Sequence, residues 1–375
     1  MYDIAIIGAG PAGAMLAREL GLRRKVLLVD ARPMHAPLRK FGYKGKQAGF
    51  EDKCCGGLLA PDAREWLSRN GFTLPASALD AVQPGSLRGL DLSTSMERLY
   101  PTTYINLSRA AFEQWLLSLV HKDVDTLYGH RAVEINREKE GFEITFRAPG
   151  GSRLSRKCKI LIGADGANSR VRRFIGKEAP YKSRYIAVQD VFEVKPASSA
   201  MSPDLFKEYV AVFHPALTDF YGWIIPKNDR ILLGMAMPPQ VRKTKQAGEH
   251  MDTLKKYLLQ AGYDCSGEFR REGCTLLRPS AADICLGKDG AFLVGEAAGF
   301  ISPSSAEGYS YAFISAACLA GAILHSNGPE KILRAYLLKS MHLRANIVYK
   351  QMKSLVMYSP FLRQMIMHSG AFAKV

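Results

Sequence analysis

Several features that would assign a chain to a common class of protein are missing from this sequence. Its seven cysteines form no C-x-x-C pair, so a structural zinc site is not indicated. It has no G-x-S-x-G segment, the nucleophile elbow of α/β serine hydrolases. The longest apolar run, residues 312–324, is too short to span a bilayer. What remains is a globular composition over 375 residues, enough for two domains or one large interleaved domain.

Acidic residues are also scarce, since 35 Asp and Glu stand against 51 Lys and Arg, a net charge of +16. Residues 330–375 hold eight basic residues against one Glu, interleaved with Leu, Ile, Met and Tyr. Such a segment is typical of contact with an anionic membrane surface or substrate, or of a solvated basic helix that closes a fold. No recognition motif accompanies the charge, so we expect no nucleic-acid partner.

The start of the chain predicts its compartment. A strand candidate begins almost at Met1, which leaves no room for a signal peptide. An odd number of cysteines without an export signal is typical of reduced thiols. We therefore expect a cytoplasmic protein, in which the basic segment is the basis for any membrane association.

The first 33 residues, MYDIAIIGAGPAGAMLARELGLRRKVLLVDARP, predict a βαβ unit that binds a dinucleotide. Gly8 allows the tight turn from strand to helix, and Gly10 lets the backbone come close to a pyrophosphate. Gly13 lets the helix pack on the strand, and the helix N-terminus around Ala12 offers free N–H groups to the anion. Asp30 ends the second strand, 20 residues after Gly10, and can accept hydrogen bonds from a ribose diol.

Two later stretches repeat the pattern of an apolar strand followed by glycines. Residues 160–173 read ILIGADGANSRVRR and contain Asp165. Residues 291–309 read AFLVGEAAGFISPSSAEGY and contain Glu296, Glu307 and Gly308.

In this order, the three blocks resemble the flavoproteins of the p-hydroxybenzoate hydroxylase fold. Within that fold, the closest resemblance is to the geranylgeranyl reductase family, because Cys55-Gly56-Gly57-Leu58 and the YGWIIP segment that starts at Tyr221 are similar to two of its motifs.

The resemblance implies FAD as the cofactor and NAD(P)H as a transient electron donor. It implies that Asp165 lies near both nucleotides, and that Arg109 binds the diphosphate or ribityl region of FAD; without it, Arg109 would be read as a surface residue at a helix start. Where the family has an Asp that contacts the ribityl chain of FAD, this sequence has Glu296. It keeps the carboxylate, but one extra methylene moves that carboxylate farther from the backbone. The cofactor-binding residues are thus predicted to be Gly8, Gly10, Ala12, Gly13, Asp30, Cys54, Cys55, Gly56, Gly57, Arg109, Asp165, Glu296, Glu307 and Gly308.

The loop FEDKCCGGLLAPDA allows three chemistries: a metal site, a disulfide switch, or a bare backbone against a ligand. Adjacent cysteines rarely form a disulfide, because the ring would be strained. The two glycines are better explained by a backbone that approaches a flat ring closely. A plant-like K-P-C-G-G pattern selects Cys55 and an archaeal-like C-x-x-G-L spacing selects Cys54. We choose Cys55 as the acting thiol, with Cys54 supporting the loop.

The resemblance and the strand patterns together predict the fold class. We expect an α/β protein with a Rossmann-like, p-hydroxybenzoate hydroxylase-like FAD-binding domain (1–60, 100–180 and 275–330). It is interleaved with a β-rich α+β substrate domain (61–99 and 181–274) and followed by a C-terminal helical segment (331–375). Alternation places Tyr221 and Trp223 on one face of a strand, either stacked on a substrate or buried in a sheet core. The methionine-rich helices after residue 330 are expected to pack as core.

Three functions stay open at this point. The first is a flavin-dependent reductase of carbon–carbon double bonds in a hydrophobic, polyprenyl-type lipid substrate, in which Cys55 or Tyr221 gives the proton and Trp223 contacts the substrate. The second is a monooxygenase or halogenase, because the YGWIIP segment differs in one position from the halogenase pattern W-x-W-x-I-P. The third is a flavin-binding redox sensor without turnover. This function stays possible because Glu296 stands where the family has an Asp. The cysteine–glycine loop and the SPSSAEG loop favour the reductase.

Overall fold

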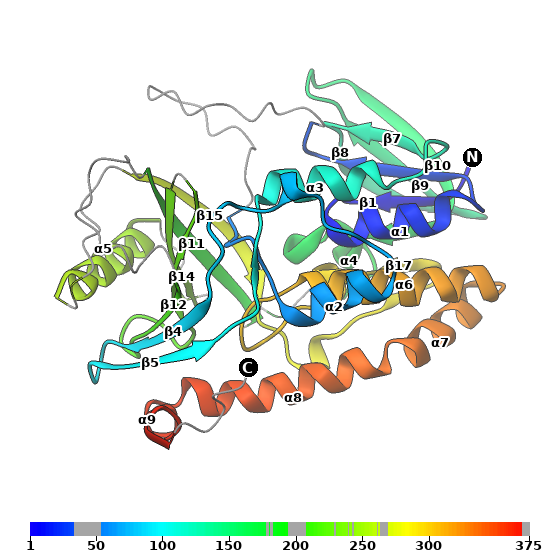
Figure 1. Cartoon of the computed structure of the whole chain (residues 1–375). Helices are drawn as coiled ribbons and strands as arrows, with labels where there is room; N and C mark the ends of the chain where they lie inside the picture. Colours follow the sequence, from blue (N-terminus) through cyan, green and yellow to red (C-terminus); the bar gives the residue numbers. More distant parts are fainter. Residues whose placement is uncertain are drawn as a thin grey trace.

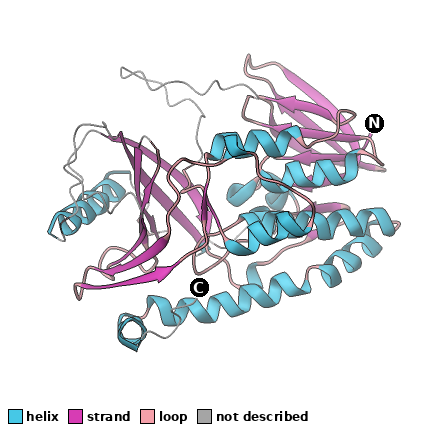
Figure 2. Cartoon of the chain, viewed as in Figure 1, coloured by secondary structure: helices cyan, strands magenta, loops and turns pink. Residues whose placement is uncertain are grey.

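A computed structural model describes residues 1–33, 54–177, 180, 183–193, 208–228, 230–238, 240–241, 244–260, 262 and 269–369. It contains two large sheets, with most helices gathered around the first, and one long C-terminal helix that runs beneath both sheets (Figure 1). Figure 2 shows the same division, with a helix-covered half near the N-terminus and a largely β half beside it.

The first sheet has a parallel centre. Its strands run in the order β16-β17-β10-β1-β2-β7, and β9 and β8 extend it from β10. Runs such as IAII and VLLVD form these strands because they are buried on both faces, as parallel sheets require. The strands are β1 (Tyr2–Ile7), β2 (Val26–Asp30), β7 (Asp125–Tyr128), β8 (Arg131–Glu138), β9 (Gly141–Arg147), β10 (Arg153–Gly163), β16 (Gly287–Lys288) and β17 (Ala291–Leu293).

The register of this sheet brings the three glycine-containing blocks together. Ile7 pairs with Gly163, and Gly163 pairs with Leu293, so β1, β10 and β17 end side by side. The loops that follow these parallel strands therefore leave from one edge of the sheet, where ligands of open α/β sheets bind. The helices around the sheet are α1 (Pro11–Gly21), α2 (Pro61–Arg69), α3 (Arg109–Ser118), α4 (Arg170–Phe174) and α6 (Tyr309–His325).

The second sheet is mixed and has the order β15-β11-β14-β13-β12-β4-β5. Its β13–β14 pair is an antiparallel hairpin. One face packs against α5 (Thr244–Gln260), and the other turns toward the first half. The strands are β4 (Ser86–Asp91), β5 (Met96–Pro101), β11 (Arg184–Glu193), β12 (Glu208–Phe213), β13 (Gly222–Pro226), β14 (Arg230–Met237) and β15 (Phe269–Leu277).

Short elements hold the connecting loops. A two-stranded ribbon, β3 (Leu58–Leu59) with β6 (Ile105–Asn106), anchors the chain directly after the Cys54–Gly57 loop. The 3-10 turns are η1 (Ala76–Ala78), η2 (Gly166–Asn168), η5 (Ala281–Asp283) and η6 (Gly295–Ala298). The division of the chain into domains at residues 60, 100, 180, 275 and 330 stays a prediction.

The C-terminal segment is helical as far as the structure describes it: α7 (Pro329–Lys339), α8 (Met341–Tyr358) and α9 (Pro360–Ser369). The expectation that its methionines form core is wrong for Met341, Met352 and Met365, which are more than half exposed. They lie on the outer side of helices whose other side already packs on the protein. In the described residues, no helix is both long enough and apolar enough to cross a membrane.

Candidate functional site

A cavity of about 240 Å³ lies between the carboxyl edge of the first sheet and one face of the second. The first half contributes the three glycine-containing loops, and the second contributes aromatic and aliphatic side chains of its strands. The predicted site residues that line it come from segments far apart in the chain: Gly10, Ala12, Cys54, Cys55, Gly56, Gly57, Arg109, Tyr221, Trp223, Glu296, Glu307 and Gly308.

The three glycines of the first block face different surroundings. A Cβ at Gly13 would lie 1.8 Å from the carbonyl oxygen of Gly8, so only glycine allows the helix to pack this closely on the strand. Gly8 has φ +105°, and a Cβ there would lie 2.3 Å from the carbonyl oxygen of Ala164. A Cβ at Gly10 would meet nothing within 4 Å, and Gly10 lines the cavity. Gly10 therefore leaves open the space that a ligand phosphate needs.

Two helices begin at this cavity. Gly10, Pro11 and Ala12 start α1, and Gly308 and Tyr309 start α6. The first amides of a helix have no intrahelical acceptor, and the helix dipole places partial positive charge at this end. Both N-termini are therefore suited to bind an anion through backbone N–H groups alone.

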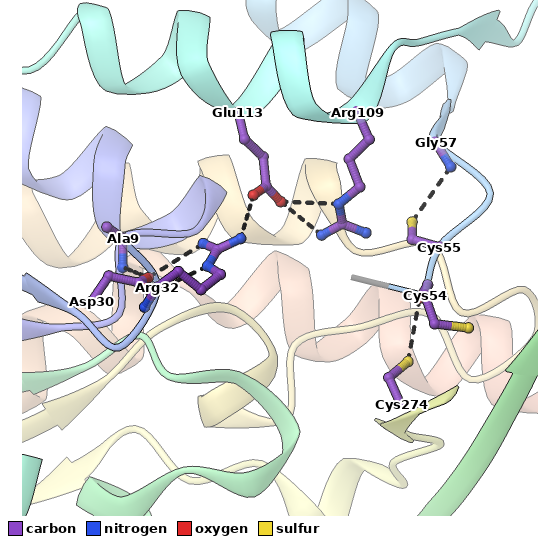
Figure 3. A network of polar contacts seen from close by, with 9 residues as sticks. All are labelled: Ala9, Asp30, Arg32, Cys54, Cys55, Gly57, Arg109, Glu113 and Cys274. Carbon is purple, nitrogen blue, oxygen red and sulfur yellow. Dashed lines mark hydrogen bonds and ion pairs between the residues drawn. The ribbon is translucent and has the colours of Figure 1, made fainter. Parts of the chain in front are cut away.

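A chain of charged side chains connects Asp30, at the end of β2, to the cavity (Figure 3). Asp30 accepts hydrogen bonds from the backbone N–H groups of Ala9 and Arg32, both at 2.8 Å, and also from the Arg32 side chain. Arg32 Nη1 donates to Glu113 Oε2 at 2.6 Å, and Arg109 Nη2 donates to Glu113 Oε1 at 2.8 Å. Burial lowers the pKa of Arg109, but the nearby Glu113 and Cys55 outweigh it and hold that pKa well above its usual value.

The two adjacent cysteines point to different partners. The Cys55 thiol lies beside the Arg109 guanidinium and accepts the backbone N–H of Gly57 at 3.5 Å. The Cys54 thiol is buried against the second sheet and donates to the carbonyl of Ala187 at 3.9 Å. Cys274, the cross-strand partner of Ala187, donates to the Cys54 carbonyl at 3.2 Å. Its thiol, together with burial, raises the pKa of Cys54 well above the usual thiol range.

The glycines after the cysteines serve the protein itself. A Cβ at Gly56 would lie 2.3 Å from Ile225 Cδ1, and Gly57, at φ +65°, would place one 2.9 Å from the Leu107 carbonyl oxygen. The predicted reason for both glycines was close approach to a flat ring. In the structure, their missing side chains let the loop press against β13 and the start of α3, and both glycines also line the cavity.

The cavity wall from the second sheet is aromatic. Tyr221 and Trp223 lie on the same face, as their alternation predicts, with ring centroids 5.9 Å apart. Tyr221 donates its hydroxyl to the Ser305 carbonyl at 2.7 Å, and Trp223 Nε1 donates to Gln189 Oε1 at 3.1 Å. Burial, followed by the neighbouring Tyr209, raises the pKa of Tyr221 well above its usual value.

The late block supplies two carboxylates to the cavity. Glu296 Oε1 accepts the backbone N–H of Leu277 at 2.9 Å, so its longer side chain links η6 to the end of β15. Glu307 accepts the hydroxyl of Tyr104 and pairs with Lys350 of α8 at 3.5 Å. Both carboxylates therefore bridge elements of different parts of the fold.

Asp165 follows β10 but does not line the cavity. Its Oδ2 accepts the backbone N–H of Arg170 at 2.6 Å, while its buried Oδ1 has no hydrogen-bond partner among the described residues. Burial raises the pKa of Asp165 from its usual value of 3.8. A buried carboxylate oxygen without a donor costs free energy in the folded protein.

Asp165→Asn is expected to stabilise the FAD-free protein at neutral pH. The pKa of Asp165 is higher in the folded protein than in the unfolded protein. The folded state therefore keeps its full stability below pH 3.8 and loses stability as the pH rises through the pKa that Asp165 has in the folded protein. Removing the charge should therefore raise the free energy of unfolding by about 1 kcal/mol at neutral pH, with no gain in acid. Urea titrations of both proteins across pH measure this. A gain that is the same at every pH would contradict the role of the charge.

Sequence reasoning missed several residues of this site. Glu113 stands four residues after Arg109 on one helix, a spacing that could have indicated the pair. Arg32 directly follows the Asp30 strand and was read only as part of the motif. Tyr104, Tyr209 and Cys274 gave no sequence signal, because only the packing of the second sheet brings them to the cavity.

The residues present fit FAD. The open space at Gly10, two helix N-termini and the partly buried guanidinium of Arg109 suit a diphosphate. Asp30 lies at the end of β2, where a ribose diol is bound in such folds. Among the described residues, no cluster of three or more His, Cys, Asp or Glu side chains could hold a metal ion.

Comparison with known proteins agrees with this geometry. The FAD binding domain family matches residues 1–345. Protein CbrA of Escherichia coli O157:H7 is 38% identical over 370 residues, 98% of this chain and 97% of that protein. A geranylgeranyl bacteriochlorophyll reductase-like protein from Thermoplasma acidophilum has a TM-score of 0.76 at 18% identity, covering 96% of this chain and 88% of that chain. p-Nitrophenol 4-monooxygenase from Pseudomonas putida DLL-E4 has a TM-score of 0.71 at 17% identity, covering 100% and 95%. The two structural matches show a shared fold, and the predicted fold class is confirmed.

Proposed function

This chain belongs to the FAD binding domain family and is an FAD-dependent oxidoreductase, and we propose that it reduces carbon–carbon double bonds of a hydrophobic, polyprenyl-type substrate. The observation that carries the proposal is an apolar, aromatic cavity wall with the Cys55 thiol lining the same cavity. Bound FAD, once reduced, supplies a hydride. The chain itself then has three tasks: it binds an apolar molecule, excludes water, and provides a proton.

The second sheet is suited to bind an apolar chain. Most of the side chains with which it lines the cavity are aromatic or aliphatic, and the polar tips of Tyr221 and Trp223 are already hydrogen-bonded to the protein. A substrate that covers this wall loses contact with water, at about 25 cal/mol for each Å² of apolar surface buried. The wall residues are Ala187, Tyr209, Tyr221, Trp223, Ile225, Cys274, Thr275 and Leu276.

Cys55 is the better candidate for the proton donor. The hydroxyl proton of Tyr221 is already donated to Ser305, and its raised pKa makes it a weaker acid. The Cys55 sulfur accepts a backbone N–H and lies beside the Arg109 guanidinium. A thiolate left after proton donation would be stabilised by that cation. Cys54 is less suited, because its thiol is buried and its pKa is strongly raised.

The test is an anaerobic turnover assay with purified, yellow holoprotein, dithionite or NAD(P)H as the reductant, and prenyl lipids as substrates. The expected product gains two mass units for each double bond. Cys55→Ser should keep the flavin spectrum and lose at least about 100-fold in rate. Cys318→Ser is the matched control, because Cys318 lies on α6, outside the cavity, with its thiol directed at the Lys339 carbonyl.

Three results would contradict the proposal. A fully active Cys55→Ser protein would show that the Cys54–Gly57 loop has a structural role only. Oxygen-dependent hydroxylation or halogenation, or stoichiometric peroxide during NAD(P)H oxidation, would assign the chain to the monooxygenase type instead. A flavin that no NAD(P)H donor reduces and that turns over no prenyl lipid after dithionite reduction would favour a redox sensor.

A further inference from the structure

The C-terminal helices carry several exposed apolar side chains. On α8, Met341, Val348, Met352 and Leu355 are 44–71% exposed. Their positions, with the small Ala345, advance by three or four residues, so they form one stripe along the helix. Leu338 of α7 and Phe361 of α9, which flank α8 in the sequence, are 66% and 69% exposed. We call these six exposed residues the outer stripe: Leu338, Met341, Val348, Met352, Leu355 and Phe361.

The fold does not need the outer stripe, because the opposite side of α8 makes the contacts with the protein. Leu343 and Ile347 are buried in the core of the first half. The Tyr358 hydroxyl donates to the Ser304 carbonyl at 2.6 Å, and Lys350 pairs with Glu307. Figure 1 shows α8 along the lower edge of the molecule, reaching from the helices of the first half to the second sheet.

Charge decides which partner fits this surface. Residues 341–375 contain no Asp or Glu. Of the basic residues of α8, Lys353 is exposed and Arg344 is partly exposed, whereas Lys350 lies on the inner side in its ion pair. A second copy of this chain would bring another +16 and another basic helix to the contact, so like charges would oppose it. An anionic bilayer surface offers the opposite charge together with an apolar interior for Met, Val, Leu and Phe side chains.

We propose that the outer stripe docks this protein on the surface of an anionic lipid bilayer, with α8 lying in the plane of the interface. The apolar side chains enter the boundary between headgroups and acyl chains, while the basic residues at its flanks contact the headgroups. No described helix is long and apolar enough to cross the bilayer, so α8 lies on the membrane.

This orientation has a consequence for the cavity. The inner side of α8 holds the loop of Ser304, Ser305 and Glu307, and the last two line the cavity. A helix with its side chains is about 10 Å across, so the cavity wall lies about one helix diameter from the bilayer. A lipid substrate could therefore reach the cavity without crossing bulk water; this last step rests on the proposed function, whereas the docking does not.

The test is co-sedimentation of the holoprotein with vesicles of phosphatidylcholine alone or mixed with phosphatidylglycerol. We expect binding to the mixed vesicles that weakens as salt is added. Met352→Glu/Leu355→Glu should lower the partition coefficient by about tenfold or more, because charges enter the apolar boundary. The matched control is Leu22→Glu/Leu259→Glu, which changes the charge equally at side chains that are 69% and 59% exposed elsewhere; it should bind like the unaltered protein.

Equal binding by the stripe variant and the control would overturn the proposal. So would absence of vesicle binding by the unaltered protein, and sedimentation analysis would then show whether a second copy covers the stripe instead. The flavin spectrum and anaerobic turnover of a water-dispersed substrate, recorded on the same samples, separate the two proposals. A protein that binds vesicles but turns over no prenyl lipid would refute the proposed function and leave the docking intact.

Discussion

Gly10→Val is expected to purify as a folded, colourless protein that binds FAD at least about 100-fold more weakly, a loss of about 2.7 kcal/mol. A Cβ at this position would meet no protein atom within 4 Å, so the fold should accept the small side chain of valine. It projects into the cavity, at the start of α1, where a pyrophosphate would lie against the backbone. Flavin absorbance after purification and fluorescence titration with added FAD measure the loss.

Two further glycine variants show that the effect belongs to the cavity. Gly85→Val also adds a side chain in open space, but Gly85 is exposed and does not line the cavity, so FAD should stay bound. Gly13→Val should fail to fold stably, because its Cβ would lie 1.8 Å from the Gly8 oxygen. If Gly10→Val retains FAD as Gly85→Val does, the glycine block does not hold the cofactor's phosphates.

Arg363→Leu is expected to destabilise the protein by about 3–5 kcal/mol, the usual cost of leaving one member of a buried ion pair alone. Asp91, at the end of β4, is fully buried and accepts a hydrogen bond from Arg363 Nε at 2.8 Å. Arg363 also donates to the Met357 carbonyl at 3.1 Å, and its guanidinium lies 4.8 Å from the Phe213 ring centroid. This arginine therefore holds α9 and the end of α8 on the second sheet.

Denaturant unfolding measures the change, and hydrogen exchange of residues 360–369 shows whether α9 detaches before the rest of the protein unfolds. Arg334→Leu, on the exposed surface of α7, removes the same charge and should have little effect. The double variant Asp91→Ala/Arg363→Leu should recover part of the loss, because no buried charge is then left unpaired. If the losses in the double variant simply add, the two side chains do not act as a pair.

The local parts of the site were predictable from the sequence because their geometry is local. The βαβ unit at residues 2–30 needs a strand, a glycine turn and a helix within one short segment, and each residue type there has one conformational reason. The parallel ends of β1, β10 and β17 bring the three blocks together wherever that sheet forms. The shared face of Tyr221 and Trp223 follows from the alternation of side chains along a strand.

The rest depended on which surfaces meet in three dimensions. Adjacent Cys54 and Cys55 look equivalent in the sequence, yet one thiol is buried on β11 and the other lies beside Arg109. The partners that decide this, Ala187 and Arg109, are far away along the chain. The Arg32–Glu113 and Asp91–Arg363 pairs, 81 and 272 residues apart, have no sequence signal either.

The methionine-rich helix makes the same distinction most clearly. By itself, the sequence of α8 determines that Met341, Val348, Met352 and Leu355 share one side of a helix, because 3.6 residues make each turn. It does not determine whether that side is covered, because burial depends on the surface packed against it. Only the tertiary structure, in which Leu343 and Ile347 take the inward position, leaves the outer stripe exposed above a basic flank.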